Sequence, residues 1–288
     1  SLSNINNPMI IWIASYPKSG NTWVRAFVSA YYFTEEGIFD PKKLSLIPDY
    51  PNQLFLDNKK VEYGEIYKYW ESSQKKLASN KKVKFLKTHN ALIAAYGKQF
   101  TSSKYSLGAI YIVRDPRNVL TSIKNHYDFK DYNSALNFMM DDNKYVWGFD
   151  NNYSKSQIIT SWKINYLSWI EKNERLKTIL IKYEDLIEDP KKPFEKIINF
   201  INKITNQSEN INYKKLDNAI RTTNFKNMQK IESNGNFKEN VYSETTLEPK
   251  KFFLLGPKND WKKILNKKII NKIKLNYSKE LKNLNYEI

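Results

Sequence analysis

The residues of this chain that are best suited to chemistry follow directly after short apolar runs. Residues 16–23 read Tyr-Pro-Lys-Ser-Gly-Asn-Thr-Trp and come after the apolar run 9–14. A strand, a tight turn and a helix in this order leave backbone N–H groups and the positive end of the helix free to bind a phosphate or sulfate, and Lys18 adds a charge. The segment is not the G-x-x-x-x-G-K-S/T phosphate loop, because its lysine precedes its single glycine. An anion site is predicted, against the alternative of an ordinary turn with a surface lysine.

A histidine stands at the end of a second apolar run. Residues 82–87 are predicted to form a strand, which ends in Lys87, Thr88 and His89. A histidine at the carboxyl end of a strand is suited to act as a general base near neutral pH, and a purely structural histidine is the alternative. The other histidine, His126, is expected only to line an acceptor pocket.

Two of the five arginines lie within four residues, directly after a third apolar run. Arg114 follows the run 108–113, and Arg117 comes three positions later. Arg114 is placed to clamp an anion through two of its N–H groups, with a structural salt bridge as the alternative. Arg117 and Asn118 are predicted to lie at the surface or to have a capping role.

The periodicity of the sequence predicts the elements that must position these residues. The predicted strands cover residues 9–14, 82–87, 108–113 and 178–182. The predicted helices cover residues 21–32, 116–127, 156–172 and 190–201, and residues 34–80 are expected to hold short helices and loops. Asp115 and Pro116 supply an N-cap and a first helical residue for the second of these helices.

Strands that alternate with helices indicate an α/β fold with a central, mostly parallel sheet flanked by helices. The chain shows no internal repeat and no linker, so a single domain over residues 1–288 is expected. In such sheets ligands bind beyond the carboxyl ends of the strands. All the polar clusters described above follow predicted strand ends, which predicts that they meet in one site.

These motifs resemble those of sulfotransferases that use 3′-phosphoadenosine 5′-phosphosulfate (PAPS). Residues 16–23 are similar to the family's Y-P-K-S-G-T-T-W loop around the 5′-phosphosulfate and differ from it at Asn21. Residues 87–89 are similar to the K-T-H of cytosolic members, whose histidine is the catalytic base. The resemblance implies a core like that of P-loop kinases, with His89, Lys18 and Lys87 as catalytic residues. It also implies that the loop binds the cofactor through Lys18, Ser19, Gly20, Asn21, Thr22 and Trp23.

The resemblance extends to the nucleotide end of the cofactor. Arg114 and Ser122, eight residues apart, are similar to the family's 3′-phosphate motif. Tyr183 begins a Tyr-Glu-Asp string like the family's Y-E-D, in which the tyrosine reaches toward the nucleotide, although the two carboxylates would also suit a cap on the next helix. Phe225 matches the phenylalanine that stacks on adenine opposite Trp23. The alternative for both rings is a place in the core.

One motif departs from the family near the C-terminus. The family has R-K-G, two further residues and then G-x-W, and its basic pair holds the 3′-phosphate together with the glycine amide. Here Gly256 and Trp261 are kept, but Leu254 and Leu255 replace the basic pair, and Lys251 or Lys258 is the candidate to substitute for it. Losing two charge-assisted contacts would cost about 1.5–3 kcal/mol each in binding.

The family's activity is the transfer of a sulfuryl group from PAPS to a hydroxyl or amine of a small acceptor. The resemblance implies in-line transfer with His89 as general base, while Lys18 and Lys87 neutralise the developing charge without a metal. Residues 34–80, 128–155 and 232–250 are expected to form the acceptor site and its lid, since loops around a fixed core set specificity.

Composition narrows the alternatives. The 288 residues include 47 Lys+Arg and 30 Asp+Glu, a net charge of +17, and no cysteine, which excludes disulfides, thiolate metal sites and a catalytic cysteine. The lysines are spread along the chain, so no specific nucleic-acid partner is expected. No apolar run approaches the roughly 20 residues of a membrane span, and residues 1–4 do not begin a secretion signal, so a cytoplasmic protein is expected.

Three other functions are weighed against sulfotransfer. A P-loop-type nucleotide kinase should have a G-K-S/T loop and a strand-end aspartate for Mg²⁺. A nucleic-acid-binding protein should carry clustered basic and aromatic residues on one face. A non-catalytic nucleotide-binding relative is suggested only by Leu254 and Leu255.

Overall fold

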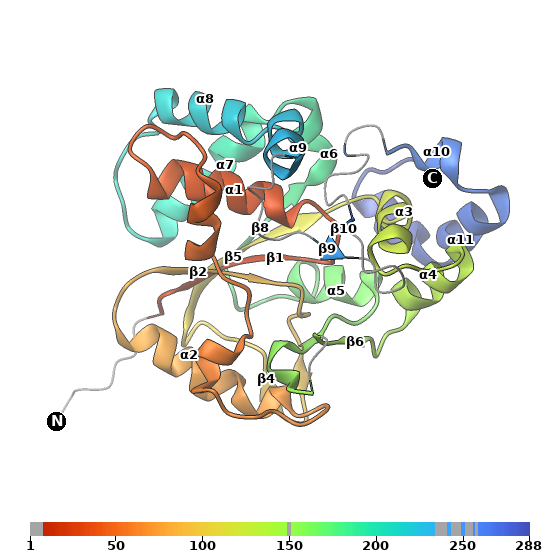
Figure 1. The fold of residues 1–288 in the computed structure, drawn as a ribbon, viewed down its shortest axis with the longest axis horizontal. Helices are drawn as coiled ribbons and strands as arrows, with labels where there is room; N and C mark the ends of the chain where they lie inside the picture. Colours follow the sequence, from red (N-terminus) through yellow and green to blue (C-terminus); the bar gives the residue numbers. More distant parts are fainter. Residues whose placement is uncertain (1–7, 149–150, 234–240, 243–248, 251–255, 257–258) are drawn as a thin grey trace.

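A four-stranded parallel sheet forms the centre of the molecule, with strands in the order β2-β1-β5-β8 (Figure 1). The computed structural model describes residues 8–148, 151–233, 241–242, 249–250, 256 and 259–288. The strands are β1 (Ile10–Ser15), β2 (Lys84–Thr88), β5 (Ser106–Val113) and β8 (Thr178–Lys182). The predicted α/β fold is confirmed, and each strand lies within two residues of its predicted range.

The central strands β1 and β5 are buried on both faces because they are made almost entirely of apolar residues. Every residue of β1 is buried. Side chains alternate along a strand, so Trp12 and Ala14 pack in one core while Ile11 and Ile13 pack in the other. A strand that is apolar on both sides needs helices on both sides, as is usual in parallel sheets.

Helices supply both layers (Figure 1). The layer over Ile11 and Ile13 contains α1 (Asn21–Phe33), α7 (Lys191–Ile204) and α8 (Tyr213–Thr222). The layer over Trp12 contains α2 (Trp70–Ser79), α3 (Pro116–His126), α4 (Tyr132–Met140), α5 (Trp162–Trp169) and α11 (Lys267–Asn283). The remaining helices are α6 (Tyr183–Glu188), α9 (Phe225–Ser233), α10 (Trp261–Ile264), η1 (Pro41–Leu46), η2 (Gln53–Leu56), η3 (Ile66–Tyr69) and η4 (Tyr153–Lys155). The short strands are β3 (Ala94–Ala95), β4 (Lys98–Gln99), β6 (Tyr145–Val146), β7 (Gln157–Ile158), β9 (Val241–Tyr242) and β10 (Pro249–Lys250).

The predicted helix over residues 156–172 is wrong at its beginning. The chain first forms β7, which pairs antiparallel with β6, and α5 starts only at Trp162. Thr160 has a φ of 61°, which a right-handed helix does not accommodate. Ser161 then caps α5, because its Oγ accepts the N–H of Ile164 at 3.2 Å. This local capping outweighs the helical spacing of the apolar residues before it.

The carboxyl ends of the four strands lie at one edge of the sheet, as parallel pairing requires. Asp115 caps α3 as predicted, since its Oδ1 accepts the N–H of Arg117 at 3.0 Å and Pro116 is the first helical residue. Among the described residues, no helix combines the length and apolar character that crossing a membrane requires.

Candidate active site

A cavity of about 290 Å³ opens at the carboxyl edge of the sheet. Every residue predicted for the site contributes to its wall: Lys18, Ser19, Gly20, Asn21, Thr22, Trp23, Lys87, His89, Arg114, Ser122, Tyr183, Phe225 and Gly256. His126 lines it as well. Residues from distant parts of the chain, such as Lys18 and Gly256, therefore meet in one place, because the parallel strands deliver their ends to the same edge.

The turn between β1 and α1 is built to leave helix N–H groups open. Gly20 occupies the N-cap position of α1 with a φ of 97°, and no side chain caps this helix end. A Cβ at position 20 would lie 2.5 Å from the Tyr183 ring, so glycine is required both by its φ and by the space. Ser19 and Thr22 are buried beside these amides. The open amides and the helix dipole favour an anion at this point.

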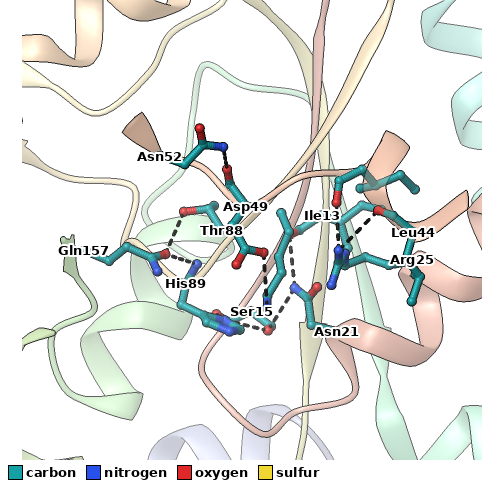
Figure 2. A network of polar contacts seen from close by, with 12 residues as sticks. Ile13, Ser15, Asn21, Arg25, Leu44, Asp49, Asn52, Thr88, His89 and Gln157 are labelled. Atoms are coloured by element: carbon teal, nitrogen blue, oxygen red, sulfur yellow. Dashed lines mark hydrogen bonds and ion pairs between the residues drawn. The ribbon is translucent and has the colours of Figure 1, made fainter. Parts of the chain in front are cut away.

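His89 is fixed by a contact that assigns its tautomer. Its Nδ1 lies 2.8 Å from the carbonyl oxygen of Ser15, which can only accept, so Nδ1 carries the hydrogen (Figure 2). Burial, and next the positive charge of Lys87, lower the pKa of His89 below its ordinary value. The neutral ring therefore keeps an unprotonated Nε2, which is the atom a general base needs.

Asn21 connects the anion-binding turn to the histidine. Its Nδ2 donates to the carbonyl of Ile13 at 3.0 Å and to Oγ of Ser15 at 3.2 Å (Figure 2). The carbonyl of Ser15 also accepts a hydrogen bond from His89. Asn21, the one residue that differs from the family's loop, therefore stabilises the strand end that holds the imidazole.

Lys87 lies beside a carboxylate that the sequence did not reveal. Its Nζ is 3.4 Å from Oδ1 of Asp49. The backbone around Asp49 pairs with β2, since the N–H of Tyr50 donates to the carbonyl of Lys87 at 2.8 Å and the N–H of Lys87 donates to Pro48 at 3.0 Å. Although partial burial opposes ionisation, the charges of Lys87 and Arg25 lower the pKa of Asp49.

Arg114 makes three contacts around the cavity. Its NH1 group donates to the carbonyl of Lys18 at 3.0 Å and to Oγ of Ser122 at 3.4 Å, and its guanidinium lies 4.2 Å from the centre of the Tyr183 ring. Its Nε is buried, and no described residue accepts a hydrogen bond from it. Because Arg114 brings its positive charge to the wall of the cavity, the geometry favours an anion here.

Two aromatic rings flank another part of the cavity. Trp23 is half-buried and packs edge-on against Tyr183 and Phe194, with ring centroids 6.0 and 6.2 Å apart. Phe225 lies so close to Gly256 that a Cβ there would be 2.3 Å from its ring. Both rings reach the cavity rather than being sealed in the core.

The prediction that Arg117 lies at the surface is wrong. Its side chain is 2% exposed and makes a two-pronged ion pair with Asp115, Nε to Oδ1 at 2.9 Å and NH2 to Oδ2 at 2.8 Å. The guanidinium also stacks 4.0 Å from the centre of the Trp261 ring. Full pairing and stacking allow the charge to be buried. Asn118 does have a capping role, because its Oδ1 accepts the first N–H of α10, from Trp261, at 3.1 Å.

The suggestion that the carboxylates after Tyr183 only cap the next helix is wrong for Glu184. Helix α6 begins at Tyr183 and has no side-chain cap. Glu184 instead accepts the N–H of Asp115 and the hydroxyl of Tyr286, each at 2.8 Å. Two long-range donors thus occupy the carboxylate, which ties the end of β5 to the C-terminal residues.

Several other lining residues escaped sequence reasoning. Gln157 accepts the backbone N–H of His89 at 2.6 Å, and Asn259 donates to Ser122 at 3.3 Å. Thr121 donates to Asn259 at 2.7 Å, and both line the cavity, as does Asp49. Thr121 and Asn259 lie within recognised motifs but were given no role there, whereas Gln157 and Asp49 belong to no recognisable string and only tertiary contacts reveal them.

Some predicted features fall outside the described residues. Leu254, Leu255, Lys251 and Lys258 all do, so the departure at the C-terminal motif is known from sequence alone. Within the described part of the chain, no group of three histidine, aspartate or glutamate side chains is arranged to hold a metal ion.

Comparison with known proteins identifies the family. The family model described as "Sulfotransferase domain" matches residues 8–285. Sulfotransferase 2A1 of Mus musculus is 24% identical over 266 residues, which cover 91% of this chain and 82% of the relative. The 3-beta-hydroxysteroid sulfotransferase of Cavia porcellus is 26% identical over 250 residues, which cover 86% of this chain and 75% of the relative.

Solved structures show the same fold. Mouse sulfotransferase SULT7A1 complexed with PAP has a TM-score of 0.57 at 17% identity. The aligned part covers 97% of this chain and 86% of the mouse chain. Retinol dehydratase in complex with androsterone and inactive cofactor PAP has a TM-score of 0.57 at 15% identity. The aligned part covers 99% of this chain and 84% of the dehydratase chain. The family match over nearly the whole length, together with the motifs gathered in one cavity, shows that the chain belongs to the sulfotransferase family and is an enzyme of that family.

Proposed function

We propose that this sulfotransferase moves the sulfuryl group of PAPS to a hydroxyl or amine of a small acceptor, with His89 as the general base. The observation that carries the proposal is the cavity itself, which joins an open anion-binding turn, a neutral histidine and a clamp arginine. Two of the solved structures with the same fold are complexes with PAP, the desulfated form 3′-phosphoadenosine 5′-phosphate.

The described residues fit such a cofactor at three points. Lys18 and the uncapped amides of α1 suit the 5′-phosphosulfate. Arg114, which lines the cavity, suits the 3′-phosphate together with Ser122. Trp23 and Phe225 suit the two faces of adenine. Bound there, PAPS supplies the sulfuryl group that is transferred.

The chain's own residues account for the rest of the chemistry. Nε2 of His89 accepts the proton of the acceptor, because Nδ1 is already committed to Ser15. Lys18 and Lys87 place positive charge where negative charge develops, as preorganised cations do in group transfer. Asn21 and Ser15 keep the imidazole in the required orientation.

The segments proposed for acceptor binding contribute unequally to the described wall. Residues 34–80 supply Asp49. Tyr127 and Gln157 flank the segment 128–155 and line the cavity from either side of it. Most of residues 232–250 lies outside the described chain.

Calorimetric titration with PAP tests the nucleotide site. Wild type should bind PAP in the micromolar range. The Arg114→Ala variant should bind about 10- to 100-fold more weakly, since a hydrogen bond to a charged group is worth about 1.5–3 kcal/mol, and Lys18→Ala should also weaken binding.

The exposed Arg175 offers a matched control, because Arg175→Ala removes the same charge away from the cavity and should leave PAP affinity unchanged. Absence of binding by wild type at low salt, or equal affinity in Arg114→Ala, would contradict the proposal.

A further inference from the structure

Asp49 is the one carboxylate among the described residues that line the cavity. Its backbone extends the sheet beside Lys87, which is its partner in parallel register. Neighbouring strands lie about 5 Å apart, and side chains two positions apart along a strand point to the same side. Asp49 therefore stands next to Lys87 and on the side of His89, where the acceptor must come.

The backbone that carries Asp49 is held firmly. The buried guanidinium of Arg25 donates to the carbonyl of Ile47 at 2.8 Å. Figure 2 shows Arg25, Asp49 and Asn52 in this network. Tyr50 is 1% exposed, and its hydroxyl lies 2.6 Å from Oγ of Ser73. Asn52 donates to the carbonyl of Asp49 at 2.7 Å. The side chain of Asp49 remains 60% exposed, so a fixed backbone presents an open carboxylate to the cavity.

The charge of Asp49 is unexpected in a pocket that binds an anion. A like charge near the phosphosulfate is unfavourable unless a cation or donor meets it. Among the residues that the structure describes, its side chain pairs with Lys87, whose Nζ lies 3.4 Å from Oδ1. When Lys87 interacts with the sulfuryl group that is transferred, the Asp49 carboxylate beside His89 loses this partner. A carboxylate only accepts hydrogen bonds, so an N–H or O–H group must then donate to it.

Resting on the proposed function, we propose that Asp49 selects acceptors that carry an N–H or O–H donor next to the reacting hydroxyl. Amino alcohols and vicinal polyols carry such a donor. An acceptor that is apolar around its hydroxyl leaves the Asp49 carboxylate without a hydrogen-bond donor. Gln157, which lines the cavity and holds the backbone of His89, makes this wall still more polar.

Three acceptors with one ring test the proposal: cyclohexanol, trans-1,2-cyclohexanediol and trans-2-aminocyclohexanol. Their dissociation constants are measured on wild type saturated with PAP, and kcat/KM for sulfuryl transfer is measured with PAPS. At least one of the two donor-bearing compounds should bind wild type about tenfold or more tightly than cyclohexanol.

Variants of Asp49 separate the two kinds of donor. Asp49→Asn keeps a carbonyl acceptor and removes the charge, so it should weaken the aminoalcohol about tenfold and affect the diol less. Asp49→Leu should remove the preference for both. Asp57→Asn serves as control, because Asp57 comes from the same segment, pairs with Lys76 outside the cavity, and has a positive φ that asparagine tolerates.

PAP titration of each variant separates the two hypotheses. If wild type does not bind PAP, the proposed function fails and this inference fails with it. If wild type binds PAP but holds cyclohexanol as tightly as the other two, or binds none of the three, only the inference about Asp49 is overturned.

Discussion

At the scale of single residues, the protonation of His89 is set by its surroundings. The carbonyl of Ser15 fixes the hydrogen on Nδ1, while burial and Lys87 disfavour the imidazolium. A base that is neutral in the resting enzyme is ready to accept a proton at neutral pH without first losing one. Position 21, where asparagine replaces the usual threonine, supports the same arrangement through Ser15.

Replacing His89 by asparagine should separate catalysis from binding. The new side-chain amide in His89→Asn keeps an N–H donor for Ser15 but has no basic nitrogen, so kcat should fall about 10²- to 10⁴-fold. PAP affinity should change little. Steady-state kinetics together with PAP titration check this, and a variant that retains most of the wild-type kcat would remove His89 from the role of base.

The lowered pKa of His89 also predicts how stability depends on pH. Below its ordinary value of 6.5, the unfolded chain binds a proton at this histidine that the folded protein refuses. The free energy of unfolding should therefore fall as the pH decreases from about 6.5, by up to about 1.4 kcal/mol per pH unit from this group.

Urea unfolding of the ligand-free protein at pH 7.5, 6.0 and 5.0 measures this dependence. The His89→Asn variant should lose less stability than wild type over the same range. Equal losses in the two proteins would show that the histidine titrates alike in the folded and unfolded states.

At the scale of elements, α3 is locked to α10 by one buried cation. Arg117 pairs with Asp115 and stacks on Trp261, while Asn118 caps α10. Asn259, just before α10, reaches Ser122 on α3, so the same junction fixes a residue of the cavity wall. The junction therefore connects stability with the shape of the site.

Removing Arg117 should destabilise the protein strongly. Arg117→Ala leaves the buried carboxylate of Asp115 without its cation, and breaking a buried pair in this way costs about 3–5 kcal/mol. Arg221→Ala removes an exposed arginine and should cost far less. Denaturant unfolding compares the two variants, and losses of equal size would argue against the buried pair as a determinant of stability.

At the scale of the whole molecule, the net charge of +17 produces a broad positive potential. Such a field attracts a polyanionic nucleotide and speeds its association, and salt screens it. The lysines that create this field are dispersed along the chain. The field should therefore change the association rate of the nucleotide rather than add a specific contact to it.

The association rate of PAP should therefore fall by about tenfold or more between 20 and 500 mM NaCl. Stopped-flow tryptophan fluorescence provides the measurement, because Trp23 lines the cavity. Binding of a neutral acceptor such as cyclohexanol should depend little on salt. An association rate that is constant across this range would mean that the global charge does not steer the nucleotide.

The sequence by itself determined the four strands of the sheet, the helices α1, α3 and α7, and the cofactor motifs. Strands 9–14 and 178–182 are visible as short apolar runs, and residues 16–23 form one continuous string. Such features depend on neighbours within a few positions, so they can be recognised locally. All the predicted site residues line one cavity, and most of them follow strands whose carboxyl ends lie at the same edge of the sheet.

The tertiary structure alone decided which distant residues meet and which charges are buried. Asp49 reaches Lys87, far along the chain, because the segment around it pairs with β2, and no local pattern encodes that pairing. Arg117 looks like a surface residue until Trp261 is placed over it. Burial and strand pairing depend on contacts between segments far apart in the chain, and these exist only once the whole domain has folded.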